Sequence, residues 1–151
     1  MSTLEFFNEA SGQSSLHTRV SVQNPLPVSG IGYPAGATPL SASSGNQANA
    51  NAVATLAGAP GQTTYITGFQ ITGGGATASA LVSPTVAGLL GGTATYTYGV
   101  VAGATAANPT LQVTFSPAIP ASALNTAIVV TAPAFGAGST NATVTAQGYR
   151  L

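Results

Sequence analysis

From residue 38 onward, apolar and polar residues alternate along much of the chain with the two-residue period of a half-buried β-strand. In the segment 93–101, alanine, tyrosine and valine take every second position, and threonine takes most positions between them. Gln70 and Gln112 occupy outward positions of their own segments. The run 128–132 is apolar throughout, as is typical of a strand buried on both faces. These segments predict an all-β domain of about eight strands. The predicted strands are 40–45, 50–56, 63–72, 80–90, 93–101, 111–115, 128–132 and 143–149.

Glycine and proline separate these segments and argue against helices. The chain has 19 glycines and 10 prolines, and in a helix interior each glycine costs about 1 kcal/mol and each proline about 3 kcal/mol. The pair Gly91-Gly92, between two alternating segments, predicts a hairpin turn. Pro84 has no N–H to donate to a ladder, so it predicts a bulge or a sheet edge within 80–90. A single helical turn is predicted, at 120–124.

The spacing of the predicted strands favours two antiparallel sheets packed as a β-sandwich. A jelly roll fits about eight strands best, and an immunoglobulin-like Greek key is the alternative. The alternation also predicts which side chains point between the sheets. The predicted core residues are Tyr65, Phe69, Ile71, Tyr96, Val113, Phe115, Ile128 and Val130.

Residues 1–37 differ from the rest and are predicted to form an extended N-terminal arm and connector, followed by the sandwich domain at 38–151. Pro25 and Pro27 fix their own φ angles and disfavour the α conformation at the residues before them. Such an extended segment loses little freedom on docking, and its unpaired backbone groups suit strand addition. The apolar residues that we expect to bind a partner are Leu4, Phe6, Phe7, Val22, Leu26 and Val28.

Charged residues are almost absent from the chain. Two arginines and two glutamates give a charged fraction of 3%, whereas an ordinary soluble domain has about 25%. No residue between Val20 and Tyr149 carries a formal charge. Free soluble proteins use scattered charge and a net charge to stay apart, and this chain has neither. We therefore expect it to work assembled against other protein, including copies of itself.

The same residue inventory bounds the chemistry. His17 is the only histidine, and it lies with both glutamates in the predicted arm, so we expect no catalytic triad and no enzyme. Three potential metal ligands in total, and no cysteine, predict no metal site, no cofactor and no disulfide. A basic patch and a long apolar segment are both missing, so we expect binding to neither nucleic acid nor membrane. The N-terminus lacks the features of a secretory signal.

Two stretches carry a resemblance to a known class of proteins. They are VSVQNPLPV at 20–28 and TYITGFQI at 64–71. The first resembles the arms of virion proteins of tailed bacteriophages. Together with the Ala/Gly/Thr-rich sandwich after it, the chain resembles the proteins that decorate phage heads, called decoration or cement proteins.

The resemblance implies a non-enzymatic subunit on the outer surface of the capsid, made in the host cytoplasm. It implies binding to the major capsid protein, at the places where copies of that protein meet. A homo-oligomer, for example a trimer, is also implied. Similar arms occur in phage tail and fibre proteins, so the alternative is a receptor-binding or head/tail-fibre module that binds a glycan or a surface protein.

Overall fold

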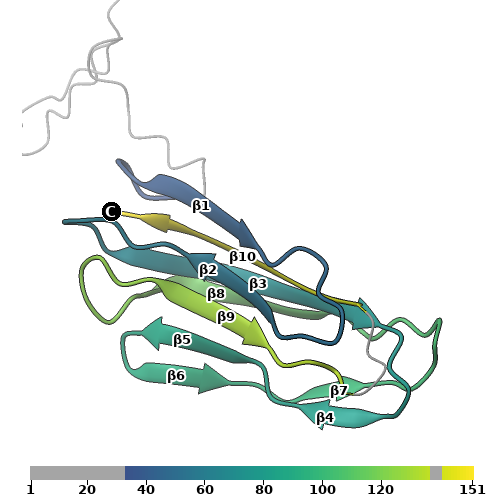
Figure 1. Ribbon diagram of the computed structural model, residues 1–151. Helices are drawn as coiled ribbons and strands as arrows, with labels where there is room; N and C mark the ends of the chain where they lie inside the picture. The colour runs from purple at the N-terminus through teal and green to yellow at the C-terminus, as the bar shows by residue number, and fades with distance from the viewer. Residues whose placement is uncertain (1–32, 137–140) are drawn as a thin grey trace, which may run out of the picture. The chain divides into compact units, whose positions relative to one another are not determined.

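The computed structural model describes residues 33–136 and 141–151, which form ten β-strands and no helix (Figure 1). The predicted all-β fold is confirmed. The strands are β1 (Thr38–Ser43), β2 (Ala52–Leu56), β3 (Thr64–Gly74), β4 (Ala80–Val82), β5 (Thr85–Leu89), β6 (Gly92–Thr95), β7 (Tyr98–Val100), β8 (Leu111–Pro120), β9 (Ile128–Ala132) and β10 (Asn141–Arg150).

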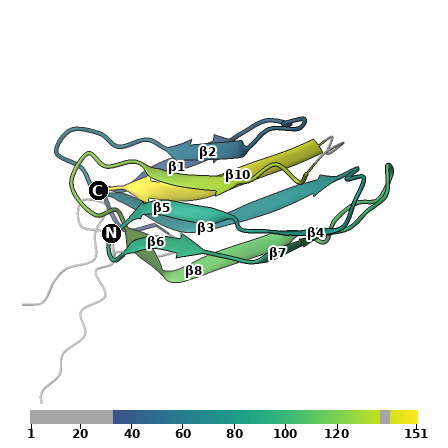
Figure 2. The same ribbon diagram turned by 60° about the horizontal axis from the view of Figure 1, so that its bottom comes forward.

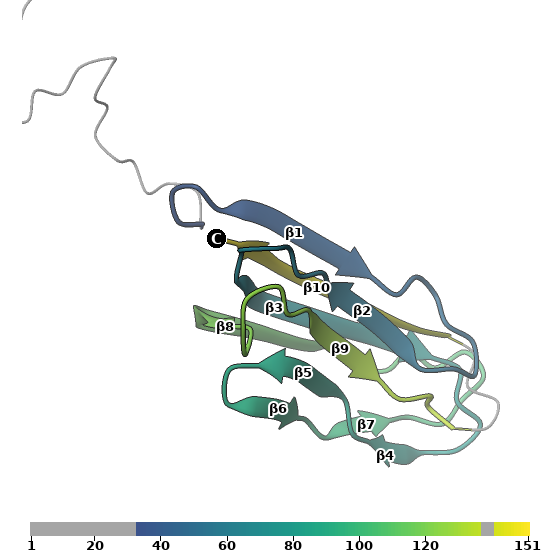
Figure 3. The ribbon, with the colours of Figure 1, turned by 60° about the vertical axis from the view of Figure 1, so that its left-hand side comes forward.

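The strands form two four-stranded sheets and one short ribbon, and the named strands all pair antiparallel. The first sheet has the order β1-β10-β3-β8 and the second the order β2-β9-β5-β6. Figure 3 shows the strands of the second sheet side by side in this order. The ribbon β4-β7 lies beyond the end of β5 and β6 (Figures 1 and 2). The predicted sandwich is thus present, while the choice between jelly-roll and immunoglobulin-like topology stays a prediction.

The core lies between the two sheets and is built from the inward residues of the alternating strands. In β2, Ala52, Ala54 and Leu56 are at most 1% exposed, whereas Val53 between them is 42% exposed. Of the predicted core residues, four are buried, namely Phe69, Ile71, Ile128 and Val130. Tyr96, Val113 and Phe115 are half-buried and pack against the edge of this core.

The prediction for Tyr65 is wrong, because β3 contains a β-bulge. The pairing of β3 with both neighbouring strands skips Thr67. An inserted residue moves every side chain on one side of it to the opposite face of the sheet. Thr64 and Ile66 therefore face the core and are 0% exposed, and Tyr65 lies on the outer face. After the bulge, the residues that were predicted to face the core do so, and Phe69 is buried.

Two predicted strands are each divided in the structure. The segment 80–90 becomes β4 and β5, and the segment 93–101 becomes β6 and β7. The first division, between β4 and β5, falls at the buried residue Pro84, and the second, between β6 and β7, falls at Tyr96. The two points are joined, because the Pro84 carbonyl oxygen accepts a hydrogen bond from the Tyr96 N–H at 2.8 Å. A proline cannot pair on its N–H side, so the chain changes from one sheet to another there.

The hairpin predicted at Gly91-Gly92 is present, but its turn lies one residue earlier: Leu89 pairs with Gly92, so Leu90 and Gly91 form the turn and Gly92 begins β6. Gly91 and Gly92 both have φ near +100° (102° and 104°). Only glycine adopts this conformation readily. The helical turn predicted at 120–124 is wrong: β8 continues to Pro120, and bends and a turn follow it. The run 128–132 alternates between buried and half-buried residues, so its predicted burial on both faces holds for one face only.

Phe135 is a core residue that the alternation missed, because it follows β9 in a loop. Its side chain is 1% exposed and packs against Tyr98, with ring centroids 5.6 Å apart. It also covers Gly73 in β3: a Cβ atom on that glycine would lie 2.3 Å from the Phe135 ring. The aromatic ring thus closes the end of the sandwich that lies away from the C-terminus.

Candidate binding surfaces

The outer face of the sheet β1-β10-β3-β8 is polar and uncharged. In β10 the buried residues Ala142, Val144 and Ala146 alternate with side chains that point away from the core. Neighbouring strands repeat this alternation, so their outward side chains form one continuous surface. These side chains end in hydroxyl or carboxamide groups: Ser41, Ser43, Gln70, Thr72, Gln112, Thr114, Thr143, Thr145 and Gln147.

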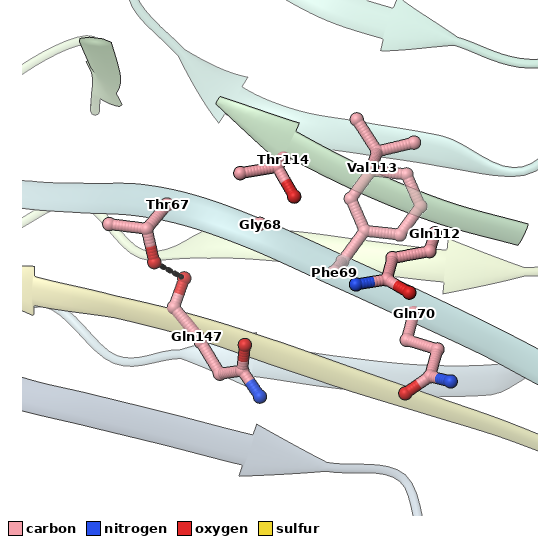
Figure 4. A pocket seen from close by; sticks show the side chains of 8 residues that line it. All are labelled: Thr67, Gly68, Phe69, Gln70, Gln112, Val113, Thr114 and Gln147. Carbon is pink, nitrogen blue, oxygen red and sulfur yellow. Dashed lines mark hydrogen bonds between the residues drawn. The ribbon is translucent and has the colours of Figure 1, made fainter. Parts of the chain in front are cut away.

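A depression of about 220 Å³ lies in this face, where β10, β3 and β8 are neighbours (Figure 4). Gly68 lies within it, and the missing side chain there leaves the face hollow. A Cβ atom at Gly68 would lie 2.6 Å from the carbonyl oxygen of Val113, so a larger residue would displace the backbone. The lining residues are Thr67, Gly68, Phe69, Gln70, Gln112, Val113, Thr114 and Gln147.

Three glutamine residues line the depression (Figure 4). Gln70 and Gln112 are paired residues of β3 and β8, and Gln147 reaches it from β10. Thr67 is held in place at the bulge, because its hydroxyl donates to the backbone carbonyl of Gln147 at 3.0 Å. Within the described part of the chain, the three carboxamides make no hydrogen bond to protein groups.

Three tyrosines pack together at one end of the same face. The rings of Tyr65 and Tyr149 are stacked with centroids 4.8 Å apart, and Tyr33 meets Tyr149 edge-on at 5.6 Å. Burial raises the pKa of Tyr149 above its usual value, and the neighbouring Tyr65 raises it further. The cluster fastens the start of the described chain to the last strand.

One end of the sandwich exposes three leucines. Leu90 is 63% exposed at the tip of the β5–β6 hairpin, Leu124 is 61% exposed in the loop after β8, and Leu151 is 40% exposed at the C-terminus. Backbone hydrogen bonds tie these segments to one another through Pro120, whose carbonyl accepts from the Leu90 N–H, and through Thr63, which exchanges two bonds with Leu151. We call Leu90, Leu124 and Leu151 the leucine end.

Arg150 is the only charged side chain in the described residues. Its Nε atom is buried and has no hydrogen-bond partner there. In the sheet, the backbone of Arg150 lies opposite Thr64 of β3 on one side and Thr38 of β1 on the other. Apart from Arg150 and the terminal carboxylate, the described surface therefore interacts with other molecules through neutral groups.

This inventory predicts an unusual pH profile for thermal unfolding. Acid unfolding requires carboxylates or histidines that titrate differently in the folded state, and residues 33–151 contain no Asp, Glu, His or Lys. Burial raises the pKa of Tyr96, Tyr98 and Tyr149. A folded-state pKa above the unfolded value gives stability that is present below about pH 10 and lost as the pH rises through the folded-state pKa. We expect a constant melting temperature from about pH 4 to pH 9 and a fall above about pH 10.

Calorimetry of the full chain between these pH values measures the profile, and Tyr149→Phe is the matched variant. This substitution keeps the ring and removes the titrating hydroxyl, so it should lessen the alkaline fall. A melting temperature that drops at acid pH would contradict the expectation, because it would require Glu5, Glu9, His17 or a terminal group to stabilise the fold.

The six residues predicted to bind a partner lie outside the described residues, as does His17. Within the described residues, no group of three or more His, Cys, Asp or Glu side chains comes together. The part of the chain that the structure describes also contains no helix long and apolar enough to cross a membrane. The chain matches no family model, no curated protein and no solved structure.

Proposed function

We propose that the chain is a non-enzymatic structural subunit of a tailed-bacteriophage virion, which binds the capsid shell as a decoration or cement protein. It would contact the major capsid protein and other copies of itself. The observation that carries the proposal is the absence of charge between Val20 and Tyr149. An uncharged surface of this kind suits a protein that stays assembled with other protein better than one that is free in solution.

The sheet edges support an assembled state. β1 and β8 are the edges of one sheet, and β2 and β6 are the edges of the other. Edge strands in free proteins usually carry charges or prolines that prevent pairing with another chain. β1 and β8 contain prolines, but β2 and β6 contain neither a proline nor a charge. A second subunit covering these edges would remove the need for such protection.

The leucine end supplies an apolar contact surface for a partner. Exposed apolar clusters in soluble proteins mark interaction sites more often than single exposed residues do. The described chain begins at Tyr33, which packs against Tyr149, two residues before Leu151. The start of the described chain and the leucine end are thus both linked to the end of β10.

Quantitative mass spectrometry of purified virions tests the proposal. We expect the chain in a number of copies comparable with that of the major capsid protein, because a cement protein occupies a site on every repeating unit of the shell. A few copies per virion would favour the receptor-binding or fibre alternative. Absence from the virion would contradict both.

A further inference from the structure

The depression around Gly68 offers donors and acceptors of hydrogen bonds close together. Each carboxamide carries an NH₂ group with two donors and a carbonyl oxygen that accepts, and a threonine hydroxyl does both. Gln70, Gln112 and Gln147 present such groups without protein partners in the described residues, and Thr114 adds a hydroxyl (Figure 4). A ligand that matches this lining also needs groups that donate and accept side by side.

The lining favours neutral ligands over charged ones. No charged side chain borders the depression. A phosphate, carboxylate or ammonium group would lose hydration there without gaining an opposite charge. Arg150 does not supply one, because it follows Tyr149 on β10 and lies on the side of the strand that faces the core. A neutral ligand rich in hydroxyl groups loses less on binding and pairs with both ends of a carboxamide.

Size and surroundings narrow the ligand class further. A volume of about 220 Å³ is below the roughly 300–1,000 Å³ of pockets for drug-sized molecules, so it suits a single ring. Tyr149 and Gln147 are two residues apart on the same face of β10, which places them about 7 Å apart along the strand. Tyr149 itself is only 7% exposed. Tyr65, which is half-buried and stacked on Tyr149, offers an aromatic ring beside the depression that a ligand can reach.

We propose that this depression binds a neutral oligosaccharide, with one sugar ring between the three glutamines and the next ring against Tyr65. The site is shallow and open to solvent, so binding is weak for a single copy and strengthened when many copies are displayed together. The inference does not depend on where in a virion the chain is located, and it concerns a face distinct from the leucine end.

Nuclear magnetic resonance titration of the ¹⁵N-labelled full chain tests the proposal. The probes are maltotetraose, cellotetraose and chitotetraose, each raised to about 20 mM, with tetragalacturonate as the charged comparison. We expect at least one neutral probe to shift the side-chain NH₂ signals of Gln70, Gln112 and Gln147, and tetragalacturonate to shift none of them.

The variant pair Gln112→Ala with Gln147→Ala removes two carboxamides and should weaken binding at least about tenfold. Its control is Thr55→Ala with Thr95→Ala, two exposed changes on the outer face of the other sheet, which should leave binding unchanged. Unchanged spectra with all three neutral probes would overturn the proposal. Equal weakening in both variant pairs, or shifts confined to other residues, would also overturn it.

Discussion

Replacing Phe69 by alanine is expected to lower the free energy of unfolding by about 3–5 kcal/mol, the range for removing a buried aromatic ring. Phe69 is 3% exposed and lies in β3, between β10 and β8. Its ring meets Tyr96 edge-on at 5.2 Å and lies 6.2 Å from Phe115. The cavity left by alanine would be enclosed by both sheets, so the surrounding structure has little room to collapse into it.

The matched control is Phe115→Ala, the same change on the edge strand β8. Phe115 is half-buried, so part of its ring already contacts water and its loss should cost less than half as much. Urea unfolding of the two variants and the unchanged chain gives both free energies. Equal losses would show that the β8 edge is as enclosed as the centre of the sheet, contrary to the fold described above.

The strand pattern was predictable from sequence because each half-buried strand alternates with a fixed period. In β2 and in the segment 93–101, inward and outward residues follow that period without interruption. The bulge at Thr67 could not be predicted in this way. Whether a strand contains an extra, unpaired residue depends on how it pairs with its neighbouring strands. That pairing is not determined by the sequence of the strand alone. A strict two-residue period therefore predicts the wrong face for Tyr65.

The depression was only partly visible in the sequence. The alternation predicts outward positions for Gln70 and Gln112, but nothing along the chain joins them to Gln147. The three meet because the sheet order brings β10, β3 and β8 together, and strand order is a property of the whole fold. The pairing of Pro120 with Leu90, which helps to form the leucine end, is likewise long-range.

Deleting residues 1–28 is expected to abolish most binding to capsids and to leave the sandwich folded. The deleted segment contains the six apolar residues predicted to bind a partner and the proline-fixed stretch 20–28. The described sandwich begins its first strand at Thr38, and its buried apolar residues lie between Ala52 and Tyr149. An unchanged melting temperature together with at least about a tenfold loss of binding is therefore the expected result.

Two further variants separate the arm from the sandwich as the point of attachment. Leu90→Ser with Leu124→Ser changes the leucine end, and Leu81→Ser is the control, because Leu81 is 77% exposed in β4 at the other end (Figure 1). If the truncated chain binds as well as the full chain and the leucine-end variant does not, the sandwich is the anchor and the role assigned to the arm is wrong.

Co-sedimentation of the full chain with capsids that lack it, at about 0.05 M and about 0.5 M salt, tests the central claim most directly. An uncharged interface has few charges for salt to screen, so the affinity should change by less than about threefold while the 1–28 deletion abolishes it at both salt concentrations. Binding that falls steeply as salt rises, or no binding by the full chain at either concentration, would contradict a virion subunit that attaches through an uncharged surface.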